Sequence, residues 1–208
     1  MKNFSSISLL CLTLAIPAFF SPAFAATPEA MPVETLDAGL IAAMKAGSAG
    51  ADFAARAKAL TPVVAQSYDL AVVTQNSVGF LWATLPAAQQ QELTTLIGAF
   101  TVASYASQFS SYDGAQFTVS PTEKPLGQGY IILTKLTPGG GGDPVELDYA
   151  VKKSASGWGI TDVLLNGTIS QVALHESDFA ALVTAGDASK LIAALKAKIA
   201  AIQSNTAS

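Results

Sequence analysis

The sequence has almost none of the residues that metal binding and nucleophilic catalysis require. Its 208 residues include one cysteine, Cys11, and one histidine, His175. A nucleophilic triad needs a Ser or Cys on a recognisable turn, and no Gly-x-Ser-x-Gly occurs. A metal site needs several His or Cys side chains or clustered carboxylates. We therefore expect no catalytic residue, no metal and no cofactor, and interpret His175 as an ordinary, partly exposed helix histidine.

Charged residues are also scarce, at 12% of the chain, whereas apolar residues make up half of it. The formal net charge is −4, and without Lys2 the chain keeps 10 basic and 15 acidic residues, a net charge of −5. This balance argues against nucleic acid as a partner and against tight adsorption to anionic membranes. The chain has much apolar surface to bury and little charge to keep it in water.

The first 25 residues have the pattern of a signal peptide. Lys2 precedes the apolar stretch Ile7 to Ile16, and Ala23-Phe24-Ala25 fits the small-x-small cleavage rule. The stretch is too short for a membrane-spanning helix. We predict cleavage after Ala25 and export. Cys11 has the wrong context for a lipoprotein and leaves with the signal, so no disulfide is expected.

The remainder reads as one domain, residues 34–203, between a linker at 26–33 and a flexible tail at 204–208. Apolar residues recur at helical spacing in several segments bounded by Gly, Pro or Asp. The expected helices run from about residue 34 to 46, from about 53 to an interruption at Pro62, over 71–85 in two pieces around Gly79, from Pro86 to a stop at 113–114, over 177–185, and from 187 onward.

The helix after Pro86 is unusual because it carries two apolar stripes. One stripe begins the helix and the other, roughly opposite, ends it: Leu93, Leu96, Ile97, Phe100 and Ala103, then Val102, Tyr105, Phe109 and Tyr112. Its second half therefore needs apolar neighbours on both flanks. One flank can be a sheet, and the other can be further helices or a ligand.

Four strands follow, joined as an antiparallel meander and flanked by helices, which indicates an α+β fold. They are expected at 116–120, 130–136, 145–152 and 158–164, with Gly139–Gly142 and Ser154–Gly157 as connections. The last two strands carry apolar residues on both faces and lead into an Asn-Gly-Thr turn. Such a sheet must be covered on both sides, by protein or by a ligand.

A series of short motifs, in order, resembles one known family. The series covers Met31 to Ile202 and includes Leu60-Thr61-Pro62-Val63-Val64, Tyr68-Asp69-Leu70, Leu85-Pro86-Ala87-Ala88-Gln89-Gln90, Leu147-Asp148-Tyr149, Gly157-Trp158 and Gly167-Thr168-Ile169-Ser170. It is similar to the MlaC, or toluene-tolerance, family of periplasmic lipid-binding proteins, and most like its hopanoid-associated branch, HpnM. Two departures are Glu176, where a basic residue is usual, and Lys152-Lys153, where the strand usually carries Arg.

The resemblance implies a twisted four-stranded antiparallel sheet wrapped by N-terminal and C-terminal helices around an apolar pocket, an NTF2-like cone. It implies a soluble periplasmic carrier that shuttles a hopanoid or a phospholipid between inner-membrane and outer-membrane complexes, with transient membrane contact. The predicted lipid-binding residues come from the two-sided helix and the sheet: Tyr105, Phe109, Phe117, Tyr130, Ile132, Tyr149, Val151, Trp158, Ile160 and Val163. Lys152 and Lys153 are predicted at the rim, near the head group.

Three alternatives remain open at this point. Each predicted pocket residue could instead be plain core packing. The protein could be a ligand-free adaptor of an ABC-type lipid transport system, which predicts a filled core. It could also be an enzyme of similar architecture acting on a hydrophobic substrate, with His175 and either Asp178 or Asp162 as its working groups.

Overall fold

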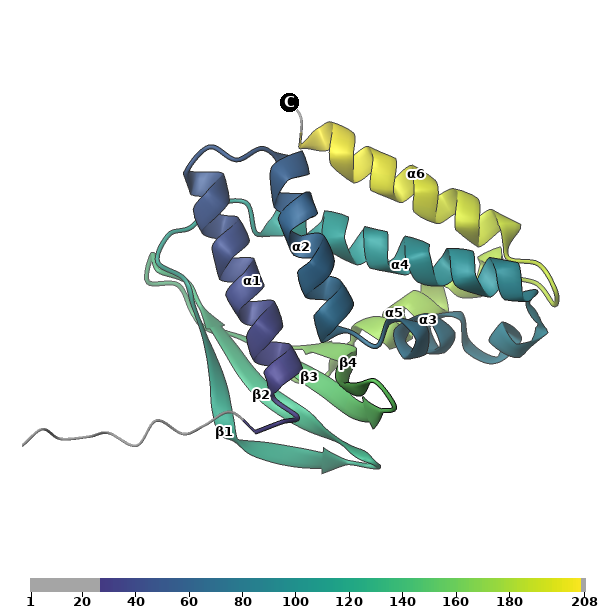
Figure 1. Cartoon of the computed structure of the whole chain (residues 1–208), viewed down its shortest axis with the longest axis horizontal. Helices are drawn as coiled ribbons and strands as arrows, with labels where there is room; N and C mark the ends of the chain where they lie inside the picture. The colour runs from purple at the N-terminus through teal and green to yellow at the C-terminus, as the bar shows by residue number, and fades with distance from the viewer. Residues whose placement is uncertain (1–26, 207–208) are drawn as a thin grey trace, which may run out of the picture.

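The computed structural model describes residues 27–206 (Figure 1). Along the chain, one group of helices precedes an antiparallel sheet and a second group follows it. The predicted signal peptide and the last two residues of the tail lie outside this range. The elements are α1 (Met31–Ser48), α2 (Phe53–Ser67), α3 (Leu70–Val78), the 3-10 helix η1 (Gly79–Thr84), α4 (Ala87–Gln108), β1 (Gln116–Leu126), β2 (Gly129–Thr137), β3 (Val145–Ser154), β4 (Gly157–Leu165), β5 (Ile169–Ser170), α5 (Gln171–Phe179), the 3-10 helix η2 (Ala180–Leu182) and α6 (Ser189–Asn205).

The sheet is a five-stranded meander in which each strand pairs with the next in sequence, in the order β1-β2-β3-β4-β5. The expected four strands are thus joined by a fifth, the two-residue β5. The first strand was also predicted too short, because it continues past Pro121 to Leu126. Pairing shifts register between Val119 and Glu123, so Pro121 lies in an irregular stretch where its missing N–H costs no ladder hydrogen bond.

The two faces of the sheet differ in chemistry. Tyr149 sits between Ile132 and Val163 in register, and all three belong to or pack on the core. The other face of β1–β3 carries Lys135, Glu146 and further polar side chains around a shallow hollow. On this face β3 carries the acidic Glu146 and Asp148, so the expectation of apolar residues on both faces was wrong at these two positions.

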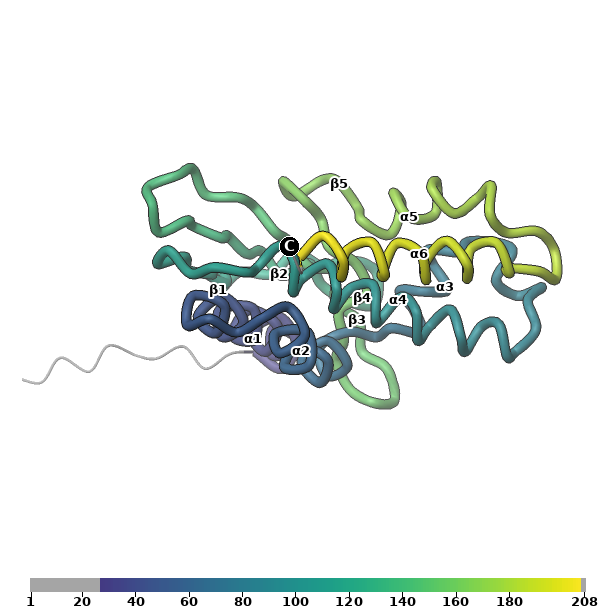
Figure 2. Tube along the Cα trace, turned by 90° about the horizontal axis from the view of Figure 1, so that it is seen from above, coloured from purple at the N-terminus to yellow at the C-terminus, as the bar shows by residue number. Residues whose placement is uncertain are grey.

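The helices cover one face of the sheet and then continue beyond it. Helices α1 and α2 cross above the strands, whereas α4 and α6 run side by side toward the end of the molecule that holds α3 and α5 (Figures 1 and 2). The molecule is therefore built from a sheet-containing end and an all-helical end, and α4 belongs to both.

Several helix boundaries differ from those expected. Helix α2 passes through Pro62 to Ser67; Pro62 is exposed, so water can solvate the carbonyl it leaves free, while Leu60 and Val64 hold the helix on the core. Helix α4 ends at Gln108, before the predicted stop. Helix α5 starts at Gln171 instead of residue 177, because Ser170 caps it.

Two hydrophobic cores correspond to the two ends of the molecule. The sheet core joins α1, α2, the end of α4 and the strands, and its buried members include Leu36, Leu40, Ile132 and Ile160. The helical core joins α3, α4, α5 and α6, and includes Leu93, Ile97, Phe179 and Leu191. The two stripes of α4 go to different cores. Leu93 and Ile97 of the first stripe belong to the helical core. Val102 of the second stripe belongs to the sheet core, and Tyr105 and Phe109 pack against it.

A candidate site between the two cores

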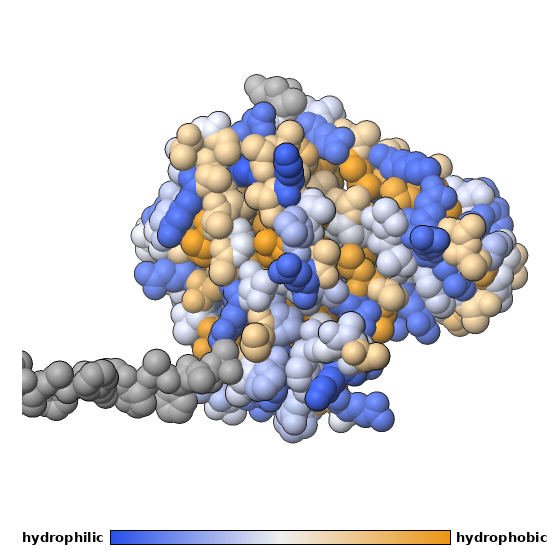
Figure 3. All heavy atoms as spheres, in the orientation of Figure 1, coloured by the Kyte–Doolittle hydropathy of each residue, from blue (hydrophilic) through white to orange (hydrophobic). Residues whose placement is uncertain are grey.

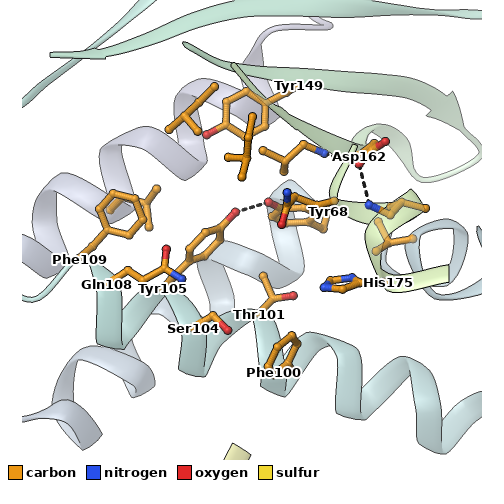
Figure 4. Close-up of a pocket in the computed structure, with 17 residues that line it drawn as sticks. Tyr68, Phe100, Thr101, Ser104, Tyr105, Gln108, Phe109, Tyr149, Asp162 and His175 are labelled. Carbon is orange, nitrogen blue, oxygen red and sulfur yellow. Dashed lines mark hydrogen bonds between the residues drawn. The ribbon is translucent and has the colours of Figure 1, made fainter. Parts of the chain in front are cut away.

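A cavity of about 300 Å³ lies where the two cores meet (Figure 4). This volume is at the lower end of the roughly 300–1,000 Å³ typical of small-molecule sites. Leu40, Phe109 and Leu147 come from the sheet core, and Val73, Phe100 and Val172 from the helical core. The remaining lining residues are Tyr68, Thr101, Ser104, Tyr105, Gln108, Tyr149, Asp162, Val163, Leu165, Gln171 and His175.

The wall nearest the sheet is formed by tyrosines whose hydroxyl groups have partners. The hydroxyls of Tyr68 and Tyr105 are hydrogen-bonded to each other (Figure 4). Burial is the main cause that raises the pKa of Tyr105 to about 12, and the pKa of Tyr149 is raised well above its usual value for the same reason. These phenols are therefore neutral at physiological pH.

Asp37 lies buried behind this wall, with 5% of its surface exposed. Burial raises the pKa of its carboxyl to about 7, against a smaller lowering by the hydroxyl of Tyr149. Neither carboxyl oxygen makes a hydrogen bond of normal geometry to the described residues. Burial in such a place favours the protonated, neutral form of the carboxyl.

The opposite wall is built on α5, and Asp162 of β4 fixes where that helix begins. The Asp162 carboxylate accepts hydrogen bonds from the hydroxyl of Ser170 at 2.5 Å and from the backbone N–H of Val172 at 3.1 Å. The Ser170 hydroxyl in turn accepts from the N–H of Ala173 at 2.9 Å. Asp162 is thus a helix cap that anchors α5 to the sheet.

His175 projects from α5 into the cavity wall (Figure 4). Its ring stacks on Phe179 with centroids 5.3 Å apart and meets the edge of Phe100 at 5.9 Å. Burial, and then the charge of Lys198, lower the pKa of His175, although Asp178 and Asp162 act in the other direction. The imidazole is therefore neutral at pH 7 and held in place by aromatic contacts.

Four of the ten predicted lipid-binding residues line this cavity: Tyr105, Phe109, Tyr149 and Val163. Ile132, Val151 and Ile160 are fully buried in the sheet core and lie outside the cavity lining. Phe117, Tyr130 and Trp158 pack against that core from partly buried positions, also outside the lining, and Tyr130 contacts Trp158 with ring centroids 5.8 Å apart. Which of these residues contact a lipid stays a prediction.

Lys152 and Lys153 are exposed near the end of β3, opposite Gly159 and Trp158 of β4, and do not line the cavity. Of the polar residues that α4 contributes to the lining, sequence reasoning predicted only Tyr105. Thr101, Ser104, Tyr105 and Gln108 have the i, i+3, i+4, i+7 spacing of one helix face, so the polar stripe was detectable. His175 was considered only as an ordinary helix histidine or as the working group of an enzyme, and Gln171 was not considered, because α5 was expected to start at residue 177.

A second hollow, of about 450 Å³, lies among α2, α4 and α6. Small and apolar residues such as Ala57, Gly98 and Ile199 line it. On this face of the molecule, apolar side chains are interspersed with hydrophilic ones (Figure 3). The two hollows therefore use different faces of α4, the first with Thr101 and Ser104, the second with Thr95 and Ala99.

Within residues 27–206, no three His, Cys, Asp or Glu side chains are grouped so that they could hold a metal ion. No helix in the same range combines the length and the apolar character needed to cross a membrane.

The sequence model of the MlaC protein family matches residues 34–197, and the chain belongs to this family. No curated protein matches the chain. Among solved structures, the chain is similar to a phospholipid-binding protein from Ralstonia solanacearum in complex with a phospholipid. The two share 20% sequence identity with a TM-score of 0.71, over 84% of this chain and 98% of the other, which establishes a common fold.

Proposed function

We propose that this protein is a lipid carrier that holds a phospholipid or a hopanoid in the cavity between its two cores. The observation that carries the proposal is the cavity itself, because the shared α4 supplies apolar and neutral polar side chains to a space that the rest of the chain does not fill. Membership of the MlaC family supports it, as does the phospholipid bound by the Ralstonia protein of the same fold.

The carrier acts in the periplasm, after cleavage of the signal peptide at Ala25, and exchanges lipid with inner-membrane and outer-membrane complexes through transient membrane contact. Each acyl CH₂ group moved out of water contributes about 0.8 kcal/mol to binding, so a lipid acyl chain needs an apolar sleeve to cross an aqueous gap. An antiparallel sheet with one helix-covered face supplies that sleeve, in the manner of an NTF2-like cone. A whole diacyl lipid exceeds the present volume, so loading widens the junction between the cores.

The competing enzyme hypothesis fits the site less well. Asp162 already accepts hydrogen bonds from Ser170 and Val172 and serves as the cap of α5. The Nδ1 atom of His175 has no hydrogen-bond partner among the described residues, so no carboxylate orients the imidazole as a general base requires. The adaptor hypothesis predicts a filled core, whereas a cavity lies beside α4.

The test is to fill the cavity from α4. Ser104→Trp places a large side chain in the lining, and Thr95→Trp places the same side chain in the second hollow as a matched control. The mature proteins are purified from periplasm and examined by native mass spectrometry, followed by lipid extraction and identification. We expect bound lipid on the wild type and on Thr95→Trp, and at least a tenfold loss on Ser104→Trp with the fold intact by circular dichroism. A wild type with no lipid that also takes none from vesicles contradicts the proposal.

A further inference from the structure

The two walls of the cavity differ in how their polar atoms are satisfied. At the tyrosine wall, the hydroxyls of Tyr68 and Tyr105 satisfy each other. At the α5 wall, the side-chain nitrogen Nε2 of Gln171 and the Nδ1 atom of His175 are both buried, and neither has a hydrogen-bond partner among the described residues. Buried polar atoms without partners are rare, because each costs free energy comparable to a lost hydrogen bond.

The two unpartnered atoms belong to one surface. Gln171 and His175 are four residues apart on α5, so their side chains lie on the same face of the helix, and both residues line the cavity. Asp162 holds the start of this helix and the rings of Phe100 and Phe179 hold His175. Both side chains therefore stand beside the cavity, and a bound lipid reaches their two buried atoms when loading widens the junction between the cores.

The chemistry of the pair restricts its partner. The Nε2 atom of Gln171 can only donate, so the partner must carry an acceptor; a neutral imidazole nitrogen can donate or accept according to its tautomer. The carboxylate of Asp162 lies in the same lining and repels an anion. Lys198 is outside the lining and lies over the ring of Phe100, 5.8 Å from its centroid. An uncharged oxygen suits this wall better than a phosphate does.

We propose that Gln171 and His175 form a hydrogen-bonding subsite for an uncharged oxygen of the bound lipid, either an ester carbonyl or a hydroxyl. This inference rests on the proposed carrier function and adds the part of the ligand that is recognised. The lipid lies with its oxygen-bearing region against α5 and its hydrocarbon against the tyrosine wall and Phe109. Specificity for the lipid then comes from the α5 wall, and the tyrosine wall contributes apolar contact alone.

The test is a direct competition between lipids that differ only in the recognised oxygen. Delipidated mature protein is offered equimolar mixtures of a diester phosphatidylglycerol with its diether analogue, and of a polycyclic triterpene alcohol with its parent hydrocarbon. Native mass spectrometry gives the ratio bound. One hydrogen bond corresponds to a preference of about five- to tenfold for the oxygenated member. A preference in the first pair identifies an ester as the recognised group, and one in the second pair identifies a hydroxyl.

The variants locate that preference. Gln171→Met keeps the length of the side chain without its amide, and His175→Phe keeps the aromatic contacts without the nitrogens; either is expected to bring the preference close to one. Ser177→Ala, exposed on the same helix, is expected to keep it.

Two results separate this inference from the function on which it rests. Equal binding within both pairs by the wild type overturns the inference and leaves the carrier function standing, as does a preference unchanged in both Gln171→Met and His175→Phe. Binding of none of the four lipids by the wild type overturns the carrier function, and the inference with it. The wild-type ratios need no variant, so a variant that fails to fold does not prevent a decision.

Discussion

The sheet core and the helical core solve the same packing problem with different side chains. The sheet core combines aliphatic residues with tyrosines and has a buried acid, Asp37, against it. The helical core is mostly aliphatic, with Phe179 buried in it and Tyr68, Trp82 and Phe100 packed against it. A strand ladder holds one wall of the cavity along several residues, whereas the other wall is a nine-residue helix held at its start by Asp162. The α5 wall is therefore held by fewer restraints than the wall formed by the sheet.

The largest expected effect comes from emptying the helical core. Leu93 is fully buried on α4, and Leu93→Ala should lower the free energy of unfolding by about 2–5 kcal/mol. Trp82 packs on the helical core and Trp158 on the sheet core, and they are the only two tryptophans of the chain. Because α4 is part of both cores, urea unfolding followed in single-tryptophan variants should move both signals together. A transition seen at Trp82 and absent at Trp158 would show two independent units.

The buried carboxyl of the sheet core should make stability depend on pH. The pKa of Asp37 is about 7 in the folded protein and 3.8 in the absence of burial, so between these values the folded state keeps a proton that the unfolded state releases. The stabilisation is complete below about pH 4 and declines as the pH rises to 7, by up to about 4 kcal/mol. His175, with its lowered pKa, acts in the opposite sense below about pH 6.5.

Urea denaturation from pH 4 to 8 measures this effect, with Asp37→Asn as the comparison. The variant should be the more stable protein at pH 8 and should lose most of the decline. An equal decline in both proteins would assign it to another group.

The smallest effect concerns the cap of α5. Asp162→Ala removes the acceptor for Ser170 and Val172 and should cost about 0.5–2 kcal/mol, the usual range for a lost N-cap. Amide hydrogen exchange should increase in α5 and stay unchanged in β3. Ser170→Ala, which removes the second cap, should act in the same direction. Faster exchange in β3 as well would mean that the wall formed by the sheet depends on α5 for its stability.

Much of this architecture was accessible from local patterns. The period-two runs after Gln116 predicted the meander, and the two stripes of α4 predicted a helix whose second half has apolar neighbours on both flanks. The pattern failed where a local signal was overruled by packing, as at Pro62 inside α2 and at Pro121 in β1. It also failed at α5, whose start depends on Asp162, a residue eight positions before Ser170 and on another element.

The candidate site was less accessible. A run of apolar residues indicates burial, and burial by other side chains looks the same in sequence as burial by a ligand. Val151 and Ile160 therefore had the same signature as Tyr149 and Val163, although only the latter two line the cavity.

The sequence by itself determined the α+β class, the family and the scarcity of catalytic groups, because these follow from composition, periodicity and motifs along the chain. The tertiary structure decided where the two cores leave a space, and that Nε2 of Gln171 and Nδ1 of His175 lie beside it with no hydrogen-bond partner among the described residues. A space and an unpaired atom are properties of surfaces brought together from distant segments. No single segment carries a signal for them.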